Sequence, residues 1–123
     1  MWLATCFGFF SVVRRDGDAR EGMLTVRGRV RADLEAFRSG YLPGASPVHE
    51  QERADYRYRF RVAEADLAKA FERIVREIDY DDFKTAVEAR QGWVRHDIYE
   101  QVGSVMRQLY CCDQPAEKEE AAV

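Results

Sequence analysis

The sequence predicts an α+β domain, with a three-stranded, mainly antiparallel sheet followed by a helical C-terminal half. Two observations predict the sheet. Residues 2–13 are almost continuously apolar or small, and residues 24–30 and 56–62 alternate apolar with polar side chains. From residue 64 onward, apolar residues recur at the spacing of three and four that one face of a helix requires. The expected element order is ββαβααα.

The apolar segment 2–13 is expected to be the central strand. A strand buried on both faces loses its alternation, whereas residues 24–30 and 56–62 keep theirs and fit positions on either side of it. Residues 16–22 mark a turn, so the first two strands are expected to form a hairpin. The predicted strand order is 2-1-3, which resembles a ferredoxin-like sheet that lacks its last strand.

A short helix and a loop are expected between the second and third strands. Asp33 is a suitable N-cap, Leu34 and Phe37 supply an apolar face, and Gly40 ends the helix. Residues 42–54 contain two prolines and a charged stretch, which is typical of an exposed loop.

Three helices are expected after the third strand. The first carries an apolar stripe at helical spacing, formed by Leu67, Phe71, Ile74, Val75 and Ile78. In residues 80–90, Phe83 and Val87 share one face, and Gly92 separates this helix from a last one that ends near Leu109.

Composition predicts one domain over residues 1–112 and a disordered acidic tail over residues 113–123. The tail holds four acids and one lysine, which accounts for the net charge of −3 and leaves the body neutral. A neutral body argues against capture of nucleic acid by bulk charge.

Cysteine usage and motifs narrow the class of protein further. The three cysteines lack the spacing of a disulfide framework or a zinc site, which predicts free thiols, a cytoplasmic location and no metal. The sequence contains neither a P-loop nor a dinucleotide fingerprint, so we predict no cofactor. Residues 1–13 lack preceding basic residues and a cleavage site, so we interpret them as a strand and expect no membrane partner.

The most distinctive feature is a set of arginines that alternation places on one face of two strands. Its members are Arg27, Arg29, Arg31, Arg57, Arg59 and Arg61. A guanidinium binds a carboxylate or a phosphate through two parallel hydrogen bonds, so this face is suited to an acidic protein surface, RNA or a nucleotide. The candidate binding residues are Arg27, Arg29, Arg57, Arg59, Arg61 and Tyr58.

A purely structural interpretation competes with binding, because the arginines can lay their stems over the sheet and pair with acids of the same chain. For RNA, Phe7 and Phe9 would supply aromatic rings on the same face, although the glycine-and-aromatic motif of RNA-recognition domains is missing. A metal-dependent enzyme would use Asp79, Asp81 and Asp82, but helix capping explains these acids more simply.

Four segments resemble a family of short bacterial proteins whose function is not known. They are MWLATCFGFFSVV, LTVRGRV, DYRYRFRV and IDYDDFKTAV, and the resemblance spans roughly residues 1–110. It implies neither catalytic residues nor a ligand for this chain.

The favoured hypothesis is a small, non-enzymatic binding or regulatory protein, of the inhibitor or immunity type, that recognises a protein through its arginine-rich face. Binding of single-stranded RNA or a nucleotide on the same face is the alternative, and an unrecognised metal-dependent enzyme is the least favoured. A homodimer is also expected, because a sheet of three strands with one very apolar strand has a second face to cover.

Overall fold

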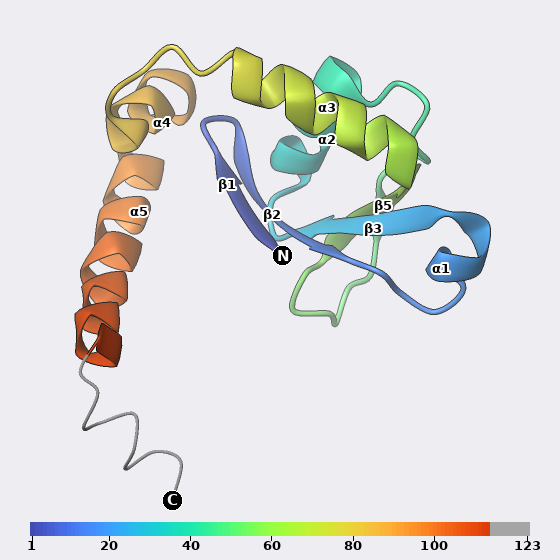
Figure 1. The fold of residues 1–123 in the computed structure, drawn as a ribbon, viewed down its shortest axis with the longest axis horizontal. Helices are drawn as coiled ribbons and strands as arrows, with labels where there is room; N and C mark the ends of the chain where they lie inside the picture. Colours follow the sequence, from blue (N-terminus) through green and yellow to red (C-terminus); the bar gives the residue numbers. More distant parts are fainter. Residues whose placement is uncertain (114–123) are drawn as a thin grey trace, which may run out of the picture. The chain divides into compact units, whose positions relative to one another are not determined.

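Residues 1–113 are described by a computed structural model, in which the chain forms two compact units (Figure 1). The first unit comprises Met1–Asp81 and the second begins at Asp82. Residues 1–112, predicted as one domain, thus contribute to both units. Asp113 ends the last helix, and residues 114–123 of the predicted acidic tail lie outside the described residues.

The first unit is built on a five-stranded antiparallel sheet in the order β1-β2-β3-β5-β4. The strands are β1 (Trp2–Thr5), β2 (Gly8–Val13), β3 (Met23–Gly28), β4 (His49–Glu50) and β5 (Tyr58–Ala63). With the helices that follow, this sheet confirms the predicted α+β class.

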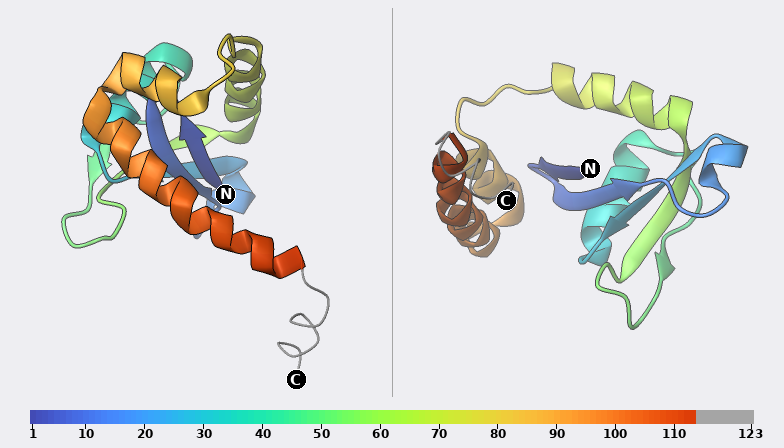
Figure 2. Two further views of the ribbon diagram at one scale, coloured as in Figure 1. Left: turned by 90° about the vertical axis from the view of Figure 1, so that its left-hand side faces the viewer. Right: turned by 60° about the horizontal axis from the view of Figure 1, so that its bottom comes forward.

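Three helices belong to the same unit: α1 (Asp18–Glu21), α2 (Arg31–Tyr41) and α3 (Glu64–Arg76). Helices α2 and α3 contribute to a single apolar core on one side of the sheet, which we call the core face (Figures 1 and 2). Phe37 of α2 lies at its centre, with its ring 4.8 Å from that of Phe10 and 6.0 Å from that of Phe60. The opposite side of the sheet, which carries the alternate strand residues, is the open face.

The prediction of one long strand over residues 2–13 is wrong, because the segment turns back after Thr5 and forms both β1 and β2. The Phe7 N–H donates to the Thr5 hydroxyl at 3.2 Å, and this hydroxyl donates to the Gly8 carbonyl at 3.0 Å, which closes a tight turn. The Phe7 side chain is buried in the core. A continuous apolar run therefore reflects two paired strands and a buried turn residue.

The predicted three-stranded sheet in the order 2-1-3 is also wrong, because β3 rather than the first strand is central. β3 alternates in spite of this position, since the helices α2 and α3 cover only its core face and arginine side chains lie over its open face. Residues 42–54, predicted as a loop, contain β4, which pairs with β5 as an added edge strand.

Helix α2 is present where a helix was predicted, but Asp33 is not its N-cap. Val30 occupies that position, and the buried Asp33 carboxylate accepts a hydrogen bond of 3.1 Å from the Phe9 backbone N–H. Asp33 therefore ties α2 to β2.

The second unit is helical, with α4 (Phe83–Gln91), α5 (Trp93–Met106) and a 3₁₀ helix, η1 (Arg107–Asp113). Gly92, with a φ of 91°, separates α4 from α5 as predicted. Lys84 pairs with Glu100 at 2.5 Å, and the Phe83 and Tyr99 rings stack at 5.7 Å, so both contacts join α4 to α5. Among residues 1–113, no helix has both the length and the apolar character that crossing a membrane requires.

Candidate functional site

The strand register aligns five residues in one row across the whole sheet. Successive cross-strand partners in this row are Trp2, Ser11, Arg27, Arg59 and His49, one from each strand. Directly opposite residues point to the same face of an antiparallel pair, so the row lies on the open face. Four steps of about 4.8 Å give it a length of about 19 Å.

The two ends of the row are exposed and its middle is partly covered. Trp2 is 69% exposed and meets the Phe9 ring edge-on at 5.7 Å, whereas Ser11 is only 2% exposed. Arg27 and Arg59 are half-buried. An apolar aromatic end therefore lies two strands away from the first arginine.

Several arginines of the predicted set are engaged by acids of the same chain. Arg29 forms two hydrogen bonds with Asp55, at 3.3 and 3.0 Å, and the Asp55 carboxylate raises the pKa of that guanidinium. Arg57 binds Glu50 at 2.8 Å, and Arg31 approaches the same carboxylate at 3.4 Å. For these arginines the structure agrees with the interpretation of internal pairing.

Arg61 is paired through a buried carboxylate. Asp18, which is 1% exposed, accepts hydrogen bonds from the Arg61 guanidinium at 2.9 Å, the Thr25 hydroxyl at 2.8 Å and the Arg15 backbone N–H at 2.7 Å. Burial alone would raise the pKa of Asp18, but these hydrogen bonds outweigh it and the pKa is lowered. Glu21 adds a second carboxylate to Arg61 at 3.3 Å.

Arg27 and Arg59 differ from the rest, because no carboxylate among residues 1–113 pairs with either. Arg27 donates to the Ser11 hydroxyl at 2.7 Å, and Arg59 donates to the Tyr56 carbonyl at 2.9 Å. The Nε atom of each arginine is buried without a hydrogen-bond partner. Most of the donors on these two guanidiniums are therefore unused by the described chain.

Arg15 adds a third positive charge to this pair. Burial and then the charges of Arg27 and Arg15 lower the pKa of Arg59. The Arg15 side chain is exposed, and no described carboxylate pairs with it. We call Arg15, Arg27 and Arg59 the open arginine cluster.

Tyrosines support this face in a way that alternation does not predict. The buried Tyr56 ring contacts two guanidiniums, since its centre lies 4.6 Å from Arg27 Cζ and 4.3 Å from Arg29 Cζ. Tyr58, predicted as a binding residue, instead packs against the core cluster, and its ring meets Arg31 at 4.9 Å. Both rings hold arginines in place by cation–π contact.

The set of binding residues predicted from the sequence leaves out five residues of this site: Trp2, Ser11, Arg15, Asp18 and Tyr56. Trp2 and Ser11 join Arg27 only through strand register, which depends on the unforeseen turn after Thr5. Asp18 meets Arg61 across 43 residues of sequence. Arg15 had a local signal, because it continues the alternation of residues 11 and 13 of β2 and is therefore expected on the same face as Ser11.

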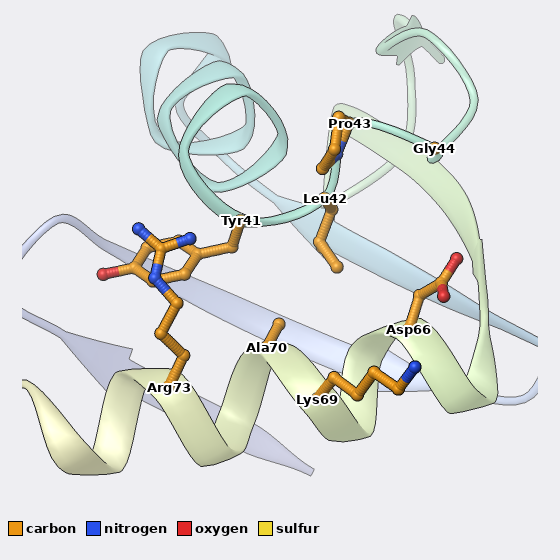
Figure 3. Close-up of a pocket in the computed structure, with 8 residues that line it drawn as sticks. All are labelled: Tyr41, Leu42, Pro43, Gly44, Asp66, Lys69, Ala70 and Arg73. Atoms are coloured by element: carbon orange, nitrogen blue, oxygen red, sulfur yellow. The ribbon is translucent and has the colours of Figure 1, made fainter.

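A separate hollow of about 260 Å³ lies between the end of α2 and helix α3 (Figure 3). Its lining residues are Tyr41, Leu42, Pro43, Gly44, Asp66, Lys69, Ala70 and Arg73. Arg73 lies over the Tyr41 ring at 4.5 Å and donates to the Gly40 carbonyl at 3.0 Å and to Glu77 at 3.1 Å. Because this guanidinium is engaged within the chain, the hollow is a weaker anion site than the open face.

Among residues 1–113, the acids proposed for a metal-dependent enzyme belong to no group of side chains that could hold a metal ion. Asp82 stands at the N-cap of α4, as the capping interpretation predicted, and its carboxylate accepts a hydrogen bond from the Thr85 hydroxyl. Within the described part of the chain, no three His, Cys, Asp or Glu side chains are grouped so that they could hold a metal ion. Asp79 and Asp81 are exposed.

Comparison of the chain with protein-family models, with curated proteins and with solved structures found no match. The chemistry of the open face is therefore the basis for a functional proposal.

Proposed function

We propose that this chain is a non-enzymatic binding protein, of the inhibitor or immunity type, that engages an acidic surface of a partner protein through the open arginine cluster. One observation carries the proposal. Arg27 and Arg59 lie opposite each other, and no carboxylate of residues 1–113 pairs with them, whereas the neighbouring arginines are paired internally.

The cost of this arrangement supports a binding role. Like charges directly opposite each other on a sheet are destabilising, and a buried donor without an acceptor loses its hydration without compensation. Both penalties fall on Arg27 and Arg59. An acidic group from a partner offsets the repulsion, because it supplies the countercharge and accepts hydrogen bonds from the terminal N–H groups of the two guanidiniums.

The rest of the row fits a protein interface. Arginine and tryptophan are the residues most often found at the energetic centres of such interfaces, and Trp2 stands exposed in the same row as the two arginines. The adjacent Phe9 ring extends this apolar end. A partner that pairs an apolar contact with an acidic group about 10 Å away would match Trp2 and Arg27, which are two strand spacings apart.

Single-stranded RNA is the second candidate, and the internal ion pairs argue against it. A strand of RNA needs a continuous track of free cations for successive phosphates. On this face, Arg29 and Arg61 already have carboxylate partners. The neutral body also lacks the positive excess that would draw a polyanion from solution.

Co-purification from the native host tests the proposal. Tagged wild-type protein, the double variant Arg27→Gln/Arg59→Gln and the control Arg57→Gln are compared by mass spectrometry and nucleic-acid detection, after circular dichroism has confirmed folding. We expect the wild type and Arg57→Gln to retain the same protein after nuclease treatment, and the double variant to lose it. Equal retention by all three chains, or loss on nuclease treatment, would refute the proposal.

A further inference from the structure

The balance of charge around the row describes the anion that it can accept. The arginines of the open face are Arg15, Arg27, Arg29, Arg59 and Arg61, and the acids that pair with them are Asp18, Glu21 and Asp55. Five positive and three negative charges leave a net charge of +2, which a single carboxylate would only half neutralise.

We propose that the open arginine cluster is a site for a phosphate monoester dianion, carried by a phosphorylated side chain of the partner protein. This inference rests on the proposed function and adds its regulation, because the partner would bind tightly only when phosphorylated. A phosphoserine or phosphothreonine carries close to two negative charges at neutral pH and offers three acceptor oxygens.

The donors of the cluster suit those oxygens. Arg27 and Arg59 belong to adjacent strands at directly opposite positions, so their Cα atoms are about 5 Å apart and their guanidiniums can contact one phosphoryl group together. Arg27 is held by the Ser11 hydroxyl and the Tyr56 ring, and Arg59 by the Tyr56 carbonyl. These contacts use few of the ten N–H donors on the two groups and leave terminal N–H groups for a ligand.

A nucleic acid fits this site less well than a phosphorylated side chain. Each internal phosphodiester carries one negative charge, so a single one would leave the cluster partly uncompensated. Its neighbours along the strand would meet arginines that are already paired with Asp18 or Asp55. An isolated dianion needs only the cluster itself.

Binding of short probes to the full chain tests the inference. The probes are the peptides Ac-Gly-phosphoserine-Gly-NH₂ and Ac-Gly-Glu-Gly-NH₂, and the nucleotide AMP, each titrated at constant ionic strength. Binding is followed by the arginine Nε–Hε resonances in NMR. Because the second pKa of a phosphate monoester is about 6, we expect the affinity for the phosphopeptide, relative to that for the glutamate peptide, to rise between pH 5 and pH 7.5. The ratio of the two affinities cancels any effect of His49, the cross-strand partner of Arg59, because it acts on both peptides.

Matched variants separate the cluster from the general charge of the face. Arg27→Gln and Arg59→Gln should each lower the affinity for the phosphopeptide about tenfold, since each removes hydrogen bonds to a charged group. Arg57→Gln, with the same loss of charge but an internally paired side chain, should change affinity less than about twofold.

Three results would overturn the inference: equal affinity for the phosphoserine and glutamate peptides, tighter binding of AMP than of the phosphopeptide, or equal losses in Arg57→Gln and Arg59→Gln. Different results would refute the proposed binding function and the phosphate site. If protein capture from the host depends on Arg27 and Arg59 but survives phosphatase treatment, the binding function stands and the phosphate site does not. If capture does not depend on these arginines, the binding function is wrong whichever probe binds.

Discussion

Arg27 of β3 and Arg59 of β5 are direct cross-strand partners, with two positive charges on one face of the sheet and no carboxylate of residues 1–113 paired with them. The two residues meet the same surroundings in different ways. Arg27 contacts the Tyr56 ring and donates to the Ser11 hydroxyl, whereas within residues 1–113 the Arg59 guanidinium donates only to the Tyr56 carbonyl. Arg59 is therefore the less compensated of the two, and its lowered pKa agrees with this.

Replacing Arg59 by methionine should not destabilise the fold. The change keeps an apolar stem over the sheet, removes the repulsion from Arg27 and removes a buried Nε that has no acceptor. The loss of the hydrogen bond to the Tyr56 carbonyl acts in the opposite direction. Together these effects should leave the free energy of unfolding unchanged or higher by up to about 1 kcal/mol, as urea denaturation would measure.

The control for this prediction is Arg61→Met, on the same strand and face. Arg61 neutralises the buried Asp18, so its loss should lower the midpoint of urea unfolding. A loss of stability in Arg59→Met as large as that in Arg61→Met would show that Arg59 is a structural residue.

Replacing Asp18 by asparagine should destabilise the first unit. The side chain has nearly the same size, but it carries no charge and has only one acceptor oxygen for the donors of Arg15, Thr25 and Arg61. Leaving part of a buried hydrogen-bond network unsatisfied costs about 1–3 kcal/mol. Urea denaturation measures the loss, and Asp16→Asn, an exposed acid two residues away, is the control that should change little.

The local part of this site was open to prediction and the long-range part was not. Alternation in residues 24–30 and 56–62 placed Arg27 and Arg59 on one face, and the register confirms it. It could not show which arginines have acidic partners, because Asp55 lies 26 residues from Arg29 and Asp18 lies 43 residues from Arg61. Those pairs depend on the fold, and so does the identity of the arginines that are left without an acidic partner.

The sheet itself shows the same limit. Residues 2–13 contain no turn signal of the Asn-Gly or Pro kind, and the turn after Thr5 is closed by a side-chain hydroxyl and a buried Phe7. The apolar residues of segment 2–13 are consistent with either one buried strand or a hairpin. Periodicity cannot separate these two, because a continuous apolar run has no alternation that would show where one strand ends and the next begins.

The pH dependence of stability follows from the lowered pKa of Asp18. The folded state holds the ionised carboxylate through its hydrogen bonds, so its pKa lies below the unfolded value of about 3.8. Below that value the unfolded chain binds a proton that the folded chain does not, and the stabilisation is lost as the pH falls through the folded pKa. The free energy of unfolding should therefore fall as the pH is lowered from 5 to 2, and it should fall less steeply in Asp18→Asn. Parallel curves for the two proteins would contradict this assignment.

Gly8 and Gly40 offer a matched test of the packing between β2 and α2. A Cβ on Gly8 would lie 2.7 Å from Asp33 Cβ and 2.7 Å from Phe10 Cζ, whereas a Cβ on Gly40 meets nothing within 4 Å. Gly8→Ala should therefore push α2 away from the sheet and lower the free energy of unfolding by about 1–3 kcal/mol, as overpacking of a core does. Gly40 lies inside α2, and alanine favours the helix more than glycine does. Gly40→Ala should therefore leave the free energy of unfolding unchanged or raise it by up to about 1 kcal/mol. Thermal or urea unfolding of both variants measures the contrast. Equal stabilities would mean that α2 does not approach β2 as closely at Gly8 as the hydrogen bond between Asp33 and Phe9 requires.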